Sequence, residues 1–509
     1  MSIKYDVIIV GGGHNALICA NVLAKKNKNV LICEARETCG GLLTNDLTNF
    51  TPSFSNKVKS EIDNISVDHS SVSTIALSET GHHLKLTGNI YEDKKTLEQL
   101  APEDVDRYFK LQKKLSLFSK TLGSFMHSSP PRILHKSFSD YFKLFKLGLN
   151  VRLMGRNSFN EFARMIGLNI ADELEDNFKN TLLQGLISHD AITGSNLGPR
   201  SPGSLINLLF RMANHDNSLF GGIQQVKGGV NAVMKSLEEN VIKRGVEIKT
   251  SSSVKRCIIE NDQVKGIELD DGTSIHANTV ISSADPKSTY LCLLGAEHLD
   301  TDFKRRIKHY RAKGRVSKLQ LVLSKIPQFT NLESKDLSQR LVISPSIDYI
   351  EENFNYSKFE NLSPEPILEL SVPSVEDELL CHNGNHIMNV QIQYAPFNVK
   401  GGWENKKAEC INNVITTLEK YAPEIRSCIL EQEFISPNDI EKNFNVSGGH
   451  WHHGEIQIDQ LFMLRPIPGA AQYKTPVSGL YMCGAGTHPG GGMTGIPGKN
   501  AAHEVLKNI

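Results

Sequence analysis

The stretch from Tyr5 to Thr44 reads YDVIIVGGGHNALICANVLAKKNKNVLICEARETCGGLLT. An apolar run at Val7–Val10 leads into the glycines at 11–13, and an apolar segment with helical periodicity follows from Ala16 to Ala24. A strand, a tight turn and a helix in this order are the first unit of a doubly wound α/β fold. The sequence therefore predicts a Rossmann-like domain at the start of the chain.

The next predicted strand, Asn29–Cys33, ends on an acid, Glu34. This acid follows the glycines by about 20 residues, the spacing of the dinucleotide-binding fingerprint. A carboxylate at this place accepts hydrogen bonds from ribose hydroxyls and repels a 2′-phosphate. We therefore expect a dinucleotide without a 2′-phosphate.

Each glycine of the turn has a physical role. Gly11 permits the sharp turn, Gly13 permits close approach of a pyrophosphate, and Ala16 permits close packing of helix and strand. The N-terminus of the helix then supplies free N–H groups and partial positive charge for the phosphates. The predicted cofactor contacts in this stretch are Gly11, Gly13, Asn15, Ala16, Glu34, Ala35, Arg36, Gly40, Gly41 and Leu42.

The residues after Glu34 favour flavin over nicotinamide. Arg36 and the doublet Gly40-Gly41 continue from the acid as ExRxxxGG. This continuation resembles the glycine doublet of FAD enzymes in the amine-oxidase and phytoene-desaturase superfamily. The resemblance implies FAD as cofactor.

Composition limits the function classes. The chain has 509 residues, and 56 Lys plus Arg balance 56 Asp plus Glu, so nothing favours nucleic acid as a partner. No apolar run is long enough to cross a membrane, and the first strand begins too early for a signal peptide. We expect a cytoplasmic protein with a small-molecule substrate, and an oligomer is possible.

The cysteines are scattered and show no CxxC spacing. An odd, dispersed set in a chain without a leader indicates reduced thiols. Flavin disulphide reductases carry a CxxxxC pair just after the glycine doublet, and Cys39 has no partner at that spacing. Thiol chemistry is therefore not expected of Cys19, Cys33, Cys39, Cys257, Cys292, Cys381, Cys410, Cys428 and Cys483.

The rest of the chain is predicted to alternate between two domains. Residues 73–86 indicate a hairpin, and a helical region extends from Pro102 to about Asn214. Residues 331–365 are predicted to be loops with a short helix, and alternation at 368–372 and 390–394 predicts half-buried strands with one polar face. The predicted FAD-binding domain comprises 1–70, 217–290 and 470–509, and an α+β substrate domain comprises 71–216 and 291–469.

The segment from Ile133 to Met154 is predicted to be a basic amphipathic helix. Aromatic and leucine side chains recur at helical spacing, and Asp140 is the one acid among several Lys and Arg residues. Such a helix can pack on its own domain or on a dimer partner, which is the favoured interpretation. Peripheral contact with an anionic membrane surface is the alternative.

The C-terminal forty residues return to the nucleotide domain. Gly479–Cys483 is a predicted strand, 484–498 a glycine-rich loop, and Asn500–Leu506 the closing helix. The loop formally matches GxGxxG, but no acid can follow, so a second nucleotide site is not expected. Backbone N–H groups here could instead stabilise negative charge on a reduced flavin. The predicted contacts are Gly484, Gly492, Met493 and Thr494.

Several long motifs extend the resemblance over nearly the whole chain. They include GGGHNAL, GPRSPG, VISSADP, VQIQYAPFNVKGGW, HGE, DQLFMLRPIPG and GLYMCGAGTHPGGGMTGIPGKNAA. The chain is similar to the phytoene-desaturase-like flavoproteins, and most similar to the branch of pyridine nucleotide-disulphide oxidoreductase domain-containing protein 2. The resemblance implies a GR2-type FAD fold, adenine contact at Val254, and oxidation or isomerisation of apolar, polyene-like substrates.

Hydride transfer to flavin requires positioning and at most one base, so no catalytic triad is expected. The histidines around the HGE motif invite a metal-site hypothesis, but their spacing matches no zinc signature. We expect an oxidoreductase acting on an apolar or amphipathic substrate, with oxygen, quinone or another soluble acceptor. The alternatives are a flavin-dependent double-bond isomerase and a FAD-stabilised interaction protein without turnover. The candidate catalytic residues are Tyr394, His453, Glu455, Arg465 and His488.

Overall fold

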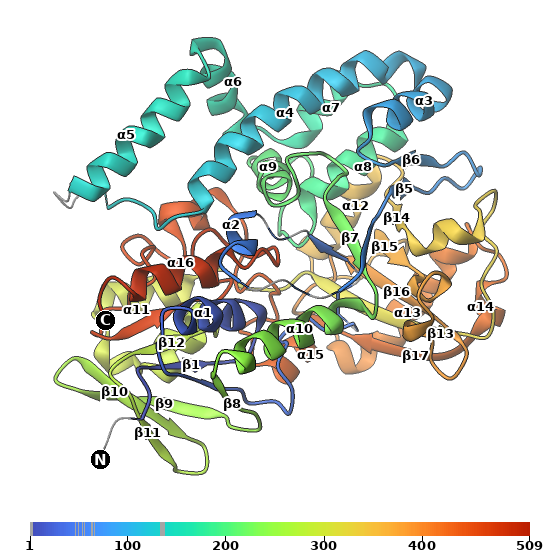
Figure 1. Ribbon diagram of the computed structural model, residues 1–509. Helices are drawn as coiled ribbons and strands as arrows, with labels where there is room; N and C mark the ends of the chain where they lie inside the picture. Colours follow the sequence, from blue (N-terminus) through green and yellow to red (C-terminus); the bar gives the residue numbers. More distant parts are fainter. Residues whose placement is uncertain are drawn as a thin grey trace.

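The computed structural model describes residues 4–509 except 46, 49, 53, 55, 63–64, 66 and 133–137. A parallel sheet of five strands, in the order β18-β12-β1-β2-β8, forms the first layer (Figure 1). The α/β fold class with a Rossmann-like domain is thereby confirmed. The strands are β1 (Val7–Val10), β2 (Val30–Cys33), β8 (Glu247–Lys249), β12 (Val280–Ser282) and β18 (Leu480–Met482).

The two faces of this sheet bury alternate residues of β1. Val7 and Ile9 pack with the helices α1 (His14–Ala24), α10 (Gly229–Lys243) and α16 (Ile496–Val505). Ile8 and Val10 pack with an antiparallel meander on the opposite face. Continuous apolar strands of this kind are expected where both faces of a parallel sheet are covered. The meander consists of β9 (Val254–Glu260), β10 (Gln263–Leu269) and β11 (Ser274–His276).

Helices α1 and α16 bring the two ends of the chain into direct contact. A methyl group added at Gly498 of α16 would lie 2.1 Å from the carbonyl oxygen of Asn15 in α1. The two helix backbones therefore lie so close together that only glycine fits at position 498. The predicted closing helix is confirmed, although it begins at Ile496 rather than at Asn500.

A mixed sheet of seven strands forms the second layer, in the order β17-β13-β16-β15-β14-β5-β6. The predicted hairpin at 73–86 is confirmed, because β5 and β6 pair antiparallel at the edge of this sheet. The strands are β5 (Thr74–Ala76), β6 (Leu84–Leu86), β13 (Val316–Leu323), β14 (Arg340–Ile343), β15 (Leu368–Ser371), β16 (His386–Gln393) and β17 (Ile429–Ile435).

Two expectations about this sheet were wrong. Residues 331–365 contain β14, a buried internal strand, in addition to the expected loops and helix. The polar face of β15 and β16 is also buried, since Glu369 and Gln391 are 8% and 5% exposed. Alternation shows that a strand has two different faces, but it does not show what covers the polar one. The apolar face packs against α13 (Trp403–Glu419).

Helices cover the polar face of the seven-stranded sheet and extend from it (Figure 1). The helical region predicted from Pro102 to about Asn214 is confirmed as α4 (Val105–Met126), α5 (Phe138–Leu153), α6 (Arg156–Gly167), α7 (Ile170–Glu175), α8 (Thr181–Ile192) and α9 (Ser204–Asn214). A further helix, α3 (Ile90–Leu100), precedes the predicted region. The other elements are α2 (Asn56–Lys59), α11 (Thr301–His309), α12 (Ile347–Lys358), α14 (Ile425–Cys428), α15 (Pro437–Phe444), and a small sheet of β3 (Thr51–Pro52), β7 (Ile223–Val226) and β4 (His69–Ser71).

The favoured interpretation placed the aromatic stripe of α5 on its own domain or on a dimer partner. Packing on its own domain is not found, and packing on a dimer partner stays a prediction. Phe138 and Phe145 are 87% and 67% exposed, and Tyr141 and Phe142 are also exposed. Figure 1 shows α5 projecting from the body beside α4 and α6. Residues 133–137, where the predicted segment begins, lie outside the described residues. Within the described part of the chain, no helix is both long and apolar enough to span a membrane.

We predict that Gly498→Ala weakens the contact between the two ends of the chain. The added methyl would overlap the Asn15 carbonyl, and overpacking of this kind costs about 1–3 kcal/mol. Thermal and denaturant unfolding should show the loss. Gly148→Ala is the control, because no heavy atom lies within 4 Å of a methyl group there. Equal stability of the two variants would contradict the proposed close contact.

Candidate functional site

One continuous cavity of about 630 Å³ joins the two layers. It begins at the carboxyl end of β1 and reaches the polar face of the seven-stranded sheet. Ligand sites in open parallel sheets lie at the carboxyl ends of the strands. The volume is within the range of small-molecule sites. Residues from both ends of the chain line this cavity.

The glycine turn is held by the acid at the end of β2. Glu34 accepts hydrogen bonds from the backbone N–H of Gly12 and from that of Arg36, the latter at 2.9 Å. Gly11 has φ +92°, a left-handed conformation that favours glycine. Glu34 thus fixes the turn and still lines the cavity with its remaining lone pairs.

Gly13 differs from Gly11, because nothing in the described part of the chain requires glycine there. Its φ of −69° suits any residue. A methyl group added at Gly13 would approach only Ser283 Oγ, at 3.9 Å. The space beside Gly13 therefore belongs to the cavity, at the N-terminus of α1.

The glycine doublet packs directly on this turn. The N–H of Gly40 donates to the carbonyl of Gly12 at 3.1 Å, and a methyl group on Gly41 would lie 3.5 Å from the Cα of Gly13. Arg36 donates to the Gly41 carbonyl at 3.3 Å and lies over the ring of Phe444. The ExRxxxGG motif thus closes the turn from the other side.

Most of the predicted cofactor contacts are brought together by the fold. Ala16 is buried between helix and sheet, Gly484 packs against the Ser283 backbone, and Thr494 accepts from the N–H of Ile496. These three do not line the cavity. The residues that do are Gly11, Gly13, Asn15, Glu34, Ala35, Arg36, Gly40, Gly41, Leu42, Val254, Gly492 and Met493.

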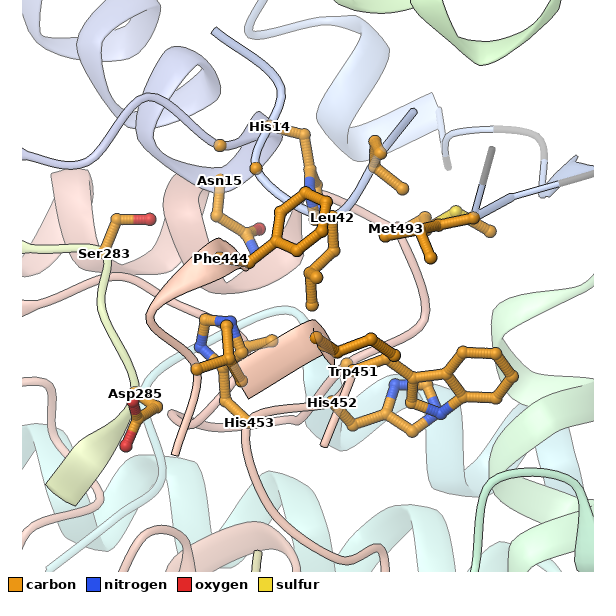
Figure 2. Close-up of a pocket in the computed structure, with 18 of the residues that line it drawn as sticks. His14, Asn15, Leu42, Ser283, Asp285, Phe444, Trp451, His452, His453 and Met493 are labelled. Atoms are coloured by element: carbon orange, nitrogen blue, oxygen red, sulfur yellow. The ribbon is translucent and has the colours of Figure 1, made fainter. Parts of the chain in front are cut away.

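Histidines from the HGE region form the wall opposite the glycine turn. Figure 2 shows His452, His453 and Trp451 facing a space that His14, Leu42 and Phe444 bound on the other side. His453 has φ +55°, and its carbonyl accepts from the Tyr310 hydroxyl at 3.0 Å. Among the described residues, no group of three or more His, Cys, Asp or Glu side chains is placed to hold a metal.

His453 has the properties of a proton-exchanging group. It is the one catalytic candidate that lines the cavity. Its Nδ1 atom is buried and has no hydrogen-bond partner in the described part of the chain. Burial lowers the pKa of His453, although Asp285 opposes the shift. A neutral imidazole in the cavity can accept a proton.

Two other candidates are structural in their contacts. Tyr394 has φ +57°, and its hydroxyl donates to the Leu197 carbonyl at 2.7 Å, outside the cavity. Glu455 pairs with Arg311 at 2.9 Å. Burial raises the pKa of Glu455, although Arg311 acts against the shift.

Arg465 and His488 also lie outside the cavity wall. Arg465 is fully buried, and among the described residues its guanidinium donates only to backbone carbonyls, those of residues 452, 454, 455, 460 and 485. This holds the histidine loop against the glycine-rich loop. His488 Nε2 meets the carbonyl of Phe125 at 3.1 Å, and burial lowers the pKa of His488 to about 4.

A buried charge cluster forms the far wall and was not found by sequence reasoning. Arg340 of β14 binds Asp190 of α8 at 2.6 Å and Glu369 of β15 at 2.7 Å. Burial alone would raise the pKa of Asp190, but Arg211 and Arg340 hold it below its usual value. Lys318 of β13 completes the wall. The available signal was a charged residue within an apolar strand, as in VSKLQLVL and RLVI.

Known proteins resemble this chain over nearly its whole length. Residues 9–55 match the NAD(P)-binding Rossmann-like domain family. Pyridine nucleotide-disulfide oxidoreductase domain-containing protein 2 of Rattus norvegicus is 27% identical over 99% of this chain and 94% of its own. Prolycopene isomerase of Daucus carota is 24% identical over 99% and 80%. The solved structure of putrescine oxidase has the same fold, with a TM-score of 0.59 and 14% identity over 99% of both chains.

We predict that Arg465→Lys destabilises the protein. A lysine ammonium has three donors and cannot reach carbonyls spread around a planar guanidinium, so buried acceptors lose partners at about 1–3 kcal/mol each. Differential scanning calorimetry should show a lower midpoint. Arg305→Lys is the control, because the Arg305 side chain is 69% exposed. An unchanged midpoint for Arg465→Lys would exclude this scaffold role.

Proposed function

We propose that this protein, a homologue of the phytoene-desaturase-like proteins, is a FAD-dependent oxidoreductase that accepts hydride from an amphipathic or apolar substrate. In this proposal residues 1–70, 217–290 and 470–509 hold the cofactor. Residues 71–216 and 291–469 hold the substrate. Relatives that include oxidoreductases and a prolycopene isomerase support the reaction class.

The observation that carries the proposal is the space beside Gly13. The protein itself leaves room there for a side chain, and φ permits one. Backbone N–H groups at the start of a helix favour a phosphate at this place. A pyrophosphate is the group that a fingerprint glycine admits. The cavity at Gly13 therefore fits the pyrophosphate of a dinucleotide.

The second half of the site favours flavin over nicotinamide. The cavity extends from the glycine turn to the loop at Gly491–Met493, which comes from the opposite end of the chain. A methyl group on Gly491 would lie 2.1 Å from His452 Nδ1, so this loop is tightly packed on the histidine wall. Flavin bound there supplies hydride acceptance at a fixed position. Gly492 and Met493 would then contact its ring system.

We assign proton exchange to His453. Removal of hydride from a C–H bond next to an O–H or N–H group also releases a proton. His453 lines the cavity, and its Nδ1 atom is buried without a partner among the described residues. Asp285 lies near it and favours the protonated form. His453 can therefore take up a proton, and the nearby Asp285 stabilises the charge that forms.

Anaerobic mixing distinguishes the three possible functions. The purified protein is mixed with candidate polyenes, amines and hydroxy compounds while the flavin absorption band is followed. Bleaching by any of them supports the oxidoreductase. Conversion of a double-bond isomer without net bleaching supports the isomerase, and neither response supports a binding protein. A colourless protein whose denatured supernatant contains no FAD would exclude the proposal.

We predict that Gly13→Ala retains the fold and loses the cofactor. As a helix N-cap, Ala in place of Gly costs less than about 1 kcal/mol. The FAD content per chain should fall to roughly a tenth or less, because the methyl group occupies the pyrophosphate position. Gly167→Ala is the matched control, since a methyl group there has no neighbour within 4 Å and does not face the cavity. Full FAD content in Gly13→Ala would refute the assignment.

A further inference from the structure

The part of the cavity beyond the glycine turn and histidine wall is polar on two sides. On one side, α9 presents Asn207 and Arg211, four residues apart on one helical face. On the other, Lys318, Gln391 and Glu369 lie in one row across β13, β16 and β15. With Asp190 and Arg340, these residues form what we call the polar chamber. Both walls are therefore built from faces that a protein normally turns to water.

The charges of the polar chamber do not balance. The cations are Arg211, Lys318 and Arg340, and the acids are Asp190 and Glu369. Arg340 binds both acids, and Arg211 Nε lies 3.4 Å from Asp190. The neighbouring histidines His189 and His215 add no charge near neutral pH, because burial lowers their pKa values. One positive charge remains.

Lys318 carries that remaining charge. It is 4% exposed and lines the cavity. In the described part of the chain its side chain has no ion pair or hydrogen bond, and the ammonium lies 6.0 Å from the centre of the Trp451 ring. Burial lowers the pKa of Lys318 to about 8, although Glu369 opposes the shift, so it is protonated at neutral pH. A buried ammonium without a partner is costly and indicates a ligand of opposite charge.

Uncharged groups of the same walls are unpartnered as well. Both side-chain polar atoms of Asn207 lack hydrogen-bond partners among the described residues, as does Asn214 Oδ1. Both residues line the cavity. Buried polar atoms in folded proteins nearly always have partners. A polar ligand group would satisfy these atoms together with Lys318.

We propose that the polar chamber binds a carboxylate group of the substrate, with Lys318 as its counter-charge and Arg211 and Asn207 as further donors. The inference rests on the proposed function, because it assigns the substrate class of the same cavity. It implies an amphipathic substrate, with an acid group at the chamber and the reacting carbon nearer the glycine-rich loop. A pure hydrocarbon would leave the Lys318 charge buried without compensation.

Matched acids and amides test the proposal on the FAD-loaded protein. The probes are hexanoate and phenylacetate, each paired with its primary amide, which has nearly the same shape and no charge. Binding is measured as perturbation of the flavin spectrum and as a rise in Tm. The acids should bind roughly ten- to hundredfold more tightly than the amides, the range of a charged hydrogen bond.

Lys318→Met should have two opposite effects. The preference for acids over amides should fall roughly ten- to hundredfold. Tm without ligand should rise or stay unchanged, because a buried charge is replaced by an apolar side chain of similar length. A purely structural Lys318 would instead give a lower Tm. Lys318→Arg, which retains the charge, should retain part of the preference.

The outcomes separate this inference from the proposed function. A yellow protein that binds acids no better than amides would overturn the polar-chamber proposal and leave the FAD proposal intact. A preference that survives in Lys318→Met would also overturn it. A protein without FAD would overturn the proposed function first. Tight binding of the acids by wild-type protein alone supports both.

A second inference rests on the exposed stripe of α5. Its large apolar side chains lie within about 120° of one another at 100° per residue. Their exposed fractions lie between 42% and 87%. An apolar face of this size on a soluble protein marks a contact surface. The stripe consists of Phe138, Tyr141, Phe142, Phe145, Leu149 and Leu153.

The charges around the stripe favour lipid over a second copy of the chain. Lys146 and Arg152 are exposed beside it, and Asp140 is the one acid of the helix. Two copies of α5 pairing face to face would bring like charges together. A surface of anionic lipid offers matching charge, and aromatic rings with lysines are typical of helices that lie in the membrane interface. We infer that α5 docks the protein on an anionic membrane surface.

Liposome flotation tests this docking. The full-length protein should float with vesicles of phosphatidylcholine and phosphatidylglycerol, and much less with phosphatidylcholine alone or at high salt. The double variant Phe142→Ser/Phe145→Ser should reduce the floating fraction roughly tenfold or more. Phe359→Ser is the control, because Phe359 is 66% exposed on another helix end. Failure of wild type to float, or a dimer that the double variant dissociates, would overturn the inference.

Discussion

The parallel pairing of β1 with both β2 and β12 is the constraint on which the site depends. It places the glycine turn between two strand ends. Because β12 also pairs with β18, the C-terminal loop emerges at the same edge of the sheet. The contact of α16 with α1, through Gly498, then locks the two chain ends together. A cavity lined by residues nearly 500 positions apart follows from these three short parallel pairings.

The parts of the site that the sequence predicted are those whose requirement is local. The glycine turn, the acid at the end of β2 and the glycine doublet all serve the backbone geometry of one continuous stretch, Gly11–Gly41. Gly11, with its positive φ, and Glu34, bonded to Gly12, are of this kind. Gly13 is the informative exception, because no neighbour among the described residues requires glycine there. Local patterns of this type can be recognised before the fold is known.

The residues that the sequence did not identify act through partners far away in the chain. Arg340 binds Asp190 and Glu369, which approach it only because β14 lies beside β15 and beneath α8. Arg465 was chosen as a candidate catalytic residue because of its residue type, but its hydrogen-bond partners are backbone carbonyls. Side-chain chemistry alone cannot distinguish a buried scaffold arginine from a ligand-binding one. Lys318 differs from Arg340 because its side chain has no ion pair in the described structure.

Two surfaces of the protein depart from the rule that apolar side chains are buried and polar side chains face water, and both departures have the same physical meaning. The polar face of the seven-stranded sheet is inside, and the aromatic face of α5 is outside. Each arrangement destabilises the isolated chain, because polar groups lose water and apolar groups retain it. A sequence that needed only stability would place an apolar residue at Lys318 and a polar one at Phe145. Both positions therefore indicate molecules that complete the protein, a charged group in the cavity and an apolar surface beside α5.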